Sequence, residues 1–89
     1  MNSSLSDRYI KLQRMILLME KRDARGMPVP FDISFVRLSD GKVDSYRGCH
    51  LTSRHIEGGT VNVMKKGDFR PRKIRLALIL TFNNLKVYH

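Results

Sequence analysis

The sequence has no tryptophan, a single cysteine and only eight acidic residues among its 89. One cysteine, Cys49, cannot form a disulfide within the chain, which suits a reducing compartment. No apolar run approaches the roughly 20 residues that a membrane-spanning helix needs. The longest apolar run near the N-terminus, Met15 to Met19, is shorter than the core of a signal peptide. We therefore expect a cytoplasmic protein with no membrane partner.

The chain also lacks a recognisable catalytic constellation. Its carboxylates are scattered singly along the β region, so no pair suggests acid–base chemistry. Gly58-Gly59 lacks the rest of any phosphate-binding loop. Cys49 and His50 are adjacent, and neighbours on a strand point to opposite faces, so they cannot form a nucleophile–base pair there. We predict that the protein has no catalytic residues and is not an enzyme.

Cys49, His50 and His55 resemble part of a metal site. A structural zinc site needs four ligands, and this cluster supplies three. We therefore predict a buried cysteine beside two loop histidines, with no metal and no other cofactor. Completion of the site by another chain in an assembly stays an open alternative.

Positive charge is what the sequence has in excess. Seventeen Lys and Arg residues give a formal net charge of +9 and a pI near 10.3. Such a charge favours a polyanionic partner, nucleic acid above all. The alternative is a protein or an assembly subunit that is basic without binding a polyanion.

The length corresponds to one domain, residues 1–89. An apolar stripe at helical spacing, which includes Tyr9, Leu12 and Ile16, predicts a helix over about 7–25. Gly26 and Pro28 end that helix and open a linker over 26–30.

A β region over 31–89 follows, and its patterns predict about five strands. Alternation of Phe31, Ile33 and Phe35 marks the first strand, and Asp40-Gly41 marks a hairpin turn to a second over about 42–47. The remaining strands are expected over 60–64, 74–82 and 85–88, with Asn83-Asn84 as a tight turn. Residues 74–82, apolar on both faces, should form a central strand, with Ile74, Leu76, Leu78, Leu80 and Phe82 on one face and Arg75, Ala77, Ile79 and Thr81 on the other. The predicted fold is α+β: an N-terminal helix followed by a mainly antiparallel sheet or a small, partly open barrel.

The densest positive charge lies just before the most apolar strand, and we call residues 65–75 the basic segment. Its side chains would contact phosphates, and an aromatic ring within it would stack on a base. In the alternative interpretation the ring is a core anchor and the charges are a solvated collar that protects the strand from aggregation. The candidate nucleic-acid-binding residues are Lys65, Lys66, Phe69, Arg70, Arg72, Lys73 and Arg75, with Lys11 and Arg14 on the helix.

Two stretches, Pro30-Phe-Asp-Ile-Ser-Phe-Val36 and Lys73-Ile-Arg-Leu…Phe-Asn-Asn-Leu-Lys-Val-Tyr88, resemble small uncharacterised proteins of Bacteroidetes genomes and their prophages. The resemblance covers about the last 60 residues and implies a phage or mobile-element setting, including a virion location, but no activity. Two functions therefore remain open. The first is a non-enzymatic module that binds nucleic acid through backbone phosphates without strong sequence specificity. The second is a structural or interaction protein, such as a phage assembly subunit that oligomerises. The sequence does not distinguish DNA from RNA or fix the oligomeric state.

Overall fold

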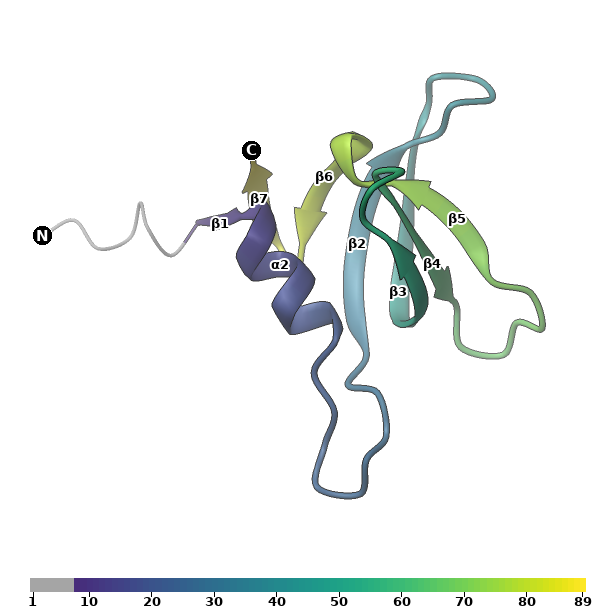
Figure 1. The fold of residues 1–89 in the computed structure, drawn as a ribbon. Helices are drawn as coiled ribbons and strands as arrows, with labels where there is room; N and C mark the ends of the chain where they lie inside the picture. Colours follow the sequence, from purple (N-terminus) through teal and green to yellow (C-terminus); the bar gives the residue numbers. More distant parts are fainter. Residues whose placement is uncertain (1–7) are drawn as a thin grey trace, which may run out of the picture.

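The chain forms one short α-helix and an open, mixed sheet of seven strands in a computed structural model that describes residues 8–89 (Figure 1). The α+β class is confirmed, although the sheet has more strands than the expected five. Within the described residues, no helix is long and apolar enough to cross a membrane. The elements are β1 (Tyr9–Lys11), α2 (Leu12–Met19), β2 (Phe31–Val36), β3 (Val43–His55), β4 (Thr60–Met64), β5 (Arg72–Arg75), the 3₁₀ turn η1 (Leu76–Leu78), β6 (Ile79–Phe82) and β7 (Leu85–Tyr88).

The strand order is β1-β7-β6-β2-β3-β4-β5, so β1 and β5 are the two edges of the sheet. Only the pairing of β1 with β7 is parallel. The long strand β3 joins the two halves, because residues 43–49 pair with β2 and residues 50–55 pair with β4. Near Gly48, whose φ is 66°, the register with β2 shifts by a bulge that bends the strand. The Gly48 N–H donates to Asp32 Oδ1 at 2.8 Å, which helps to hold this bend.

The predicted helix over 7–25 is wrong at both ends. Residues Tyr9–Lys11 form β1 instead, because they pair with residues 86–88 of β7 and so gain backbone hydrogen bonds that no sequence pattern within the segment reveals. The helix then runs only from Leu12 to Met19, with Met15 and Met19 buried beneath it. Asp7, the predicted first residue, lies outside the described residues.

The chain after the helix is a hairpin-like loop over residues 20–30, which projects from the body in Figure 1. Asp23 organises the loop: its Oδ1 accepts hydrogen bonds from the N–H groups of Arg25 and Met27, at 2.8 and 3.0 Å. An isolated bridge joins Arg22 to Pro28. The linker predicted over 26–30 is therefore the returning arm of this loop. An Asp that bonds nearby backbone competes with helix formation, which explains why the helix does not reach Arg25.

The apolar run over 74–82 is not one central strand, and that prediction is also wrong. The 3₁₀ turn Leu76–Leu78 divides it into edge strand β5 and inner strand β6, which pairs with β2 and β7. The turn changes the phase of the side chains, because 3₁₀ geometry has three residues per turn and a strand has two. Ile79 is consequently buried, whereas Leu80, expected on the same face as the buried Ile74, is 41% exposed.

The shorter strands agree better with their predicted positions. β2, β4 and β7 occupy 31–36, 60–64 and 85–88, and Asn83 and Asn84 have φ of 49° and 67° in the tight turn. The second strand was expected to end near Arg47, but β3 continues to His55.

The core lies between the helix and the curved sheet, and aromatic rings form its centre. The rings of Phe31 and Phe82 have centroids 5.2 Å apart, and those of Phe35 and Tyr46 are 4.9 Å apart, edge to face. The buried apolar residues are Ile10, Met15, Met19, Phe31, Ile33, Phe35, Tyr46, Cys49, Val61, Val63, Ile74, Leu76, Ile79 and Phe82.

Candidate functional site

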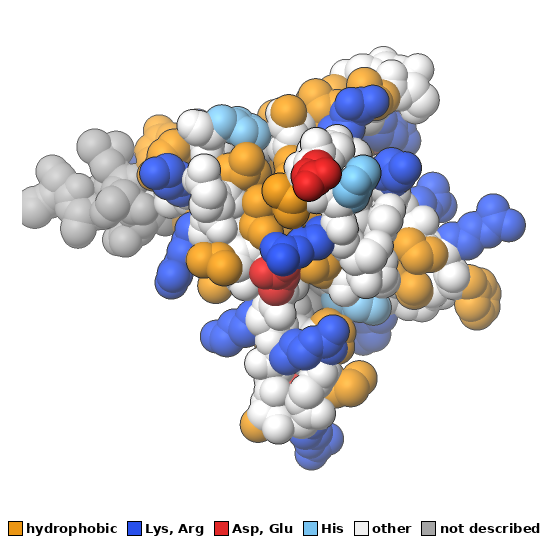
Figure 2. Space-filling model, in the orientation of Figure 1, with side chains coloured by type: hydrophobic (Ala, Val, Ile, Leu, Met, Phe, Trp, Pro, Cys, Tyr) orange, Lys and Arg blue, Asp and Glu red, His pale blue; other side chains and the backbone are white. Residues whose placement is uncertain are grey.

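The basic segment forms an exposed loop, residues 65–71, followed by edge strand β5. It carries six cations and a single carboxylate, Asp68. The nearest approach of that carboxylate to a cation is 3.9 Å, from Asp68 Oδ2 to Arg72 Nε, which is too long for a hydrogen bond. Figure 2 shows that Lys and Arg side chains are spread over one face of the molecule while acidic ones are few. The exposed cations of the segment are Lys66, Arg70, Arg72, Lys73 and Arg75.

Phe69 lies in this loop with 94% of its surface exposed. The alternative in which Phe69 anchors the core is therefore wrong. A fully exposed phenyl ring is unusual because its burial would be worth roughly 2–3 kcal/mol. In a loop rich in cations, such a ring offers a face on which a nucleobase can stack.

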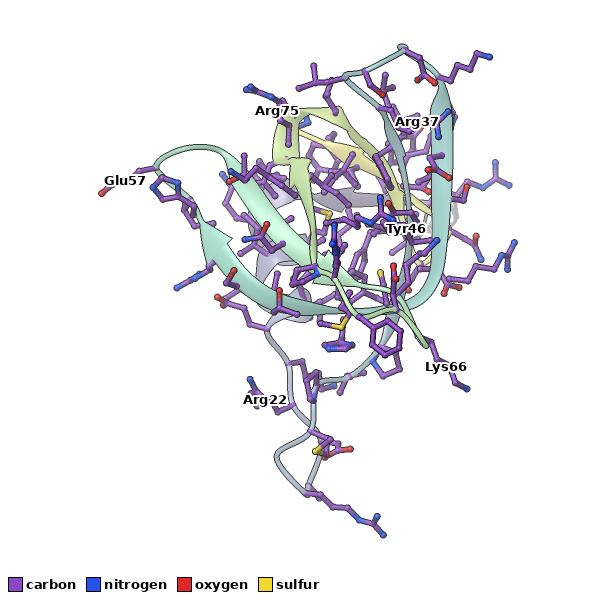
Figure 3. The ribbon with its side chains drawn as sticks, turned by 90° about the vertical axis from the view of Figure 1, so that its right-hand side faces the viewer. Arg22, Arg37, Tyr46, Glu57, Lys66 and Arg75 are labelled. Carbon is purple, nitrogen blue, oxygen red and sulfur yellow. The ribbon has the colours of Figure 1, made fainter. Side chains whose placement is uncertain are left out.

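Lys65 differs from the other cations, because it is half-buried and its Nζ lies 4.8 Å from the centroid of the Tyr46 ring. This cation–π contact fixes the start of the loop against β3. Burial raises the pKa of the Tyr46 phenol, so its hydroxyl remains a neutral hydrogen-bonding group. Figure 3 shows Tyr46 on the inner side of the sheet and Lys66 projecting from the loop.

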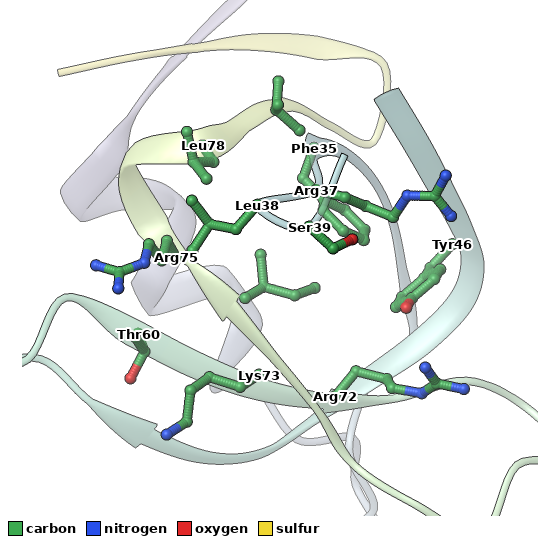
Figure 4. A pocket seen from close by; sticks show the side chains of 12 residues that line it. Phe35, Arg37, Leu38, Ser39, Tyr46, Thr60, Arg72, Lys73, Arg75 and Leu78 are labelled. Atoms are coloured by element: carbon green, nitrogen blue, oxygen red, sulfur yellow. The ribbon is translucent and has the colours of Figure 1, made fainter. Parts of the chain in front are cut away.

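A cavity of about 320 Å³ opens beside β5, between this strand and the hairpin that joins β2 to β3 (Figure 4). Its apolar lining includes Phe35, Ile74 and Leu78, and its hydroxyl groups come from Ser39, Tyr46 and Thr60. Its cations are Arg37 from the hairpin and Arg72, Lys73 and Arg75 from β5, and none of its lining residues within 8–89 carries a carboxylate.

Arg37 differs from the β5 cations because it already has acidic partners. Its Nη2 lies 2.7 Å from Asp40 Oδ2 and its Nη1 lies 3.6 Å from Asp44 Oδ2. A hydrogen bond from the Lys42 N–H, together with this arginine, lowers the pKa of Asp40, so the pair persists at neutral pH. Among residues 8–89, by contrast, no carboxylate lies within 4.0 Å of Lys73 or Arg75.

The cavity is the part of the site that sequence reasoning missed. Arg37, Leu38 and Ser39 are more than 30 positions from β5 in the chain, and only the curvature of the sheet brings them to it. No local pattern carries that information. The structure does not bring Lys11 and Arg14 to this region, because they lie on β1 and α2, and five strands separate β1 from β5.

The cysteine–histidine cluster is not drawn together either. Cys49 is fully buried and its Sγ donates to the Phe31 carbonyl at 3.3 Å. His50 is half-buried and His55 is exposed, both on β3 rather than in a loop. In the part of the chain that the structure describes, no three His, Cys, Asp or Glu residues are grouped so that they could hold a metal ion.

Burial raises the pKa of the Cys49 thiol to about 11. We expect this thiol to resist a reagent such as DTNB in the folded protein at about pH 8, and to react rapidly once the chain is unfolded. The unfolded thiol ionises near about pH 8.5, so its contribution to the free energy of unfolding is complete below that pH and is lost as pH rises towards 11. A Cys49→Ala variant should lose less stability over that window. Reaction of the folded protein at the unfolded rate would contradict this assignment.

A scan against protein-family models, a search of curated proteins and a search of solved structures gave no match to the chain. Its function has to be inferred from its own residues.

Proposed function

We propose that this protein is a small, non-enzymatic binding module that holds nucleic acid through backbone phosphates, without strong sequence specificity. The observation that carries the proposal is the basic segment: six cations with one weakly placed carboxylate, on an exposed loop and an edge strand, around a phenyl ring that is 94% exposed. Protection of an apolar strand needs only one or two charges, so a solubilising collar does not explain six. Phosphate contacts supply sequence-independent affinity, and an exposed ring adds stacking on any base.

A structural or assembly role is the second candidate, and the two edges of the sheet favour it. β5 pairs only with β4 and β1 pairs only with β7 among the described strands, so either edge offers backbone groups to another chain. Two copies joined through β5 would place the like charges of Arg72, Lys73 and Arg75 side by side. Edge β1 is therefore the better place for assembly. The phage or mobile-element setting, with a cytoplasmic or virion location, fits both candidates.

The test is fluorescence anisotropy with labelled single-stranded DNA, duplex DNA and RNA, from about 50 to about 300 mM salt. If five phosphates are contacted, log Kd should change with log salt with a slope of about 4.5 on duplex and about 3.5 on single strands. We expect micromolar binding at about 150 mM salt, which is the tight end of the range of nonspecific affinities. Light scattering on the same sample gives the mass. Binding that disappears above low salt, together with a defined oligomer, would favour the assembly role instead.

A further inference from the structure

We propose that the cavity between β5 and the β2–β3 hairpin is a binding site for one nucleotide of a single strand. The base would lie against the apolar floor and its phosphates against the cations of β5. This inference rests on the proposed function and makes it more specific, because it assigns single-stranded nucleic acid, rather than duplex, as the preferred partner.

The lining of the cavity combines the two kinds of surface that a nucleotide presents. Phe35, Ile74 and Leu78 supply apolar side chains, which suit the face of a base. Ser39 and Thr60 are also among the lining residues, and their hydroxyl groups are of a kind that can form hydrogen bonds with the polar edge of a base. Figure 4 shows Ser39 on the hairpin side of the cavity, Arg72 and Lys73 along β5, and Leu78 on the 3₁₀ turn that follows β5. A volume of about 320 Å³ is within the range of small-molecule pockets.

The charges of the cavity favour an anionic occupant. Among the described residues, Arg37 is the cavity cation with close acidic partners, because Asp40 and Asp44 hold it on the hairpin. The three β5 cations have at most the 3.9 Å contact between Arg72 and Asp68 among the described residues. Lys73 and Arg75 are two positions apart on the same face of β5, so a phosphodiester that follows this strand can meet both of them.

Two features favour a single strand over other polyanions. The bases of a duplex are stacked inside the helix and cannot reach the floor of a cavity, whereas those of a single strand are free to enter. Phe69 lies in the loop that leads directly into Arg72, so a strand leaving the cavity along β5 passes a second stacking surface. An acidic peptide would also satisfy the β5 cations, but its carboxylates make no use of an exposed phenyl ring.

The test uses a substitution whose larger side chain fills the cavity and leaves every charged residue in place. Ser39 is an exposed loop residue that lines the cavity, so we expect Ser39→Trp to fold and to occupy the space of the base. Ser45→Trp is the matched control, because Ser45 is exposed on β3 beside Tyr46 and points to the other face of the strand. Anisotropy with an oligothymidylate should show about a tenfold loss of affinity for Ser39→Trp and less than about a twofold change for Ser45→Trp. Affinity for duplex DNA should stay within about twofold of the wild type for both variants, because duplex contacts only phosphate-binding groups.

Unchanged oligothymidylate affinity in Ser39→Trp would overturn the proposal while leaving the proposed function intact. If the wild-type protein binds neither oligothymidylate nor duplex DNA, the proposed function itself is wrong. If Ser39→Trp does not fold, the amide chemical shifts of the wild type are measured with and without oligothymidylate. Changes in the shifts of Leu38, Ser39 and Thr60 on addition of the oligonucleotide support the site. No change at these residues would overturn it. Polyglutamate is the competitor. Polyglutamate and oligothymidylate are compared at the same concentration of negative charge. If polyglutamate displaces oligothymidylate from the wild type but not from Ser39→Trp, the cavity accepts acidic peptides and the nucleotide assignment is wrong.

Discussion

Neutralising five cations of the basic segment should abolish binding to nucleic acid at physiological salt while leaving the fold unchanged. Release of five counterions contributes roughly 3.7 decades of affinity to duplex at about 0.15 M salt, so we expect a loss of about a thousandfold or more. The slope of affinity against salt should fall towards zero at the same time. Four of the five side chains are exposed, which predicts only a small change in melting temperature. The variant replaces Lys65, Lys66, Arg70, Arg72 and Lys73 with glutamine.

The control for this variant has the same net charge but keeps the basic segment. Five other exposed cations that form no ion pair among the described residues are replaced with glutamine, which also lowers the formal charge from +9 to +4. If binding depends on the arrangement of charge, this control should lose only a small part of the affinity. Equal losses in the two variants would show that net charge alone drives association. The control residues are Lys21, Arg25, Lys42, Arg47 and Lys86.

Phe82→Ala should have the largest effect on stability. Phe82 is 1% exposed on β6 and its ring is in contact with that of Phe31 in the centre of the core. Truncating a buried phenylalanine costs about 3–5 kcal/mol, and a domain of this size is stable by only about 5–10 kcal/mol. We therefore expect the melting temperature to fall by at least about 15 °C, measured by circular dichroism.

Phe69→Ala is the matched control, since it makes the same substitution at a ring that is 94% exposed. Its melting temperature should stay within a few degrees of the wild type, because it leaves no cavity. Its affinity for single-stranded DNA should nonetheless fall by about tenfold if the ring stacks on a base. A substantial loss of stability in this variant would mean that Phe69 packs against the protein in solution, contrary to its exposure in the structure.

Patterns confined to one strand or one turn were predictable from the sequence. The alternation of Phe31, Ile33 and Phe35 gave β2 with its buried face, and Asn83-Asn84 gave a turn with positive φ. These features depend on neighbouring residues alone, so a short stretch of sequence is sufficient to predict them. The segment 65–75 was likewise predictable as a surface segment, because no core accommodates six cations.

Features that depend on distant pairing were not predictable. Tyr9 continues the apolar stripe of Leu12 and Ile16 at helical spacing, yet Tyr9–Lys11 becomes a strand because β7 offers an edge 77 residues further along the chain. Residues 74–82 are divided by the 3₁₀ turn because the chain crosses there from β5, beside β4, to β6, beside β2. The periodicity of apolar residues within the segment does not predict this crossing. The cavity beside β5 combines residues of four strands, a hairpin and a 3₁₀ turn, so it exists only after the sheet has curved.

The pairing of β1 with β7 has a kinetic consequence. Tyr9 pairs with Lys86, so these two strands come from opposite ends of the described chain and can pair only after both ends have met. Closing so large a loop is entropically costly, and contacts of high sequence separation slow folding. During synthesis, β2, β3 and β4 can pair as soon as they leave the ribosome, whereas β1 has to wait for β7. In that interval β1 lacks the strand with which it pairs in the folded protein, so we expect its pairing with β7 to be a late step of folding.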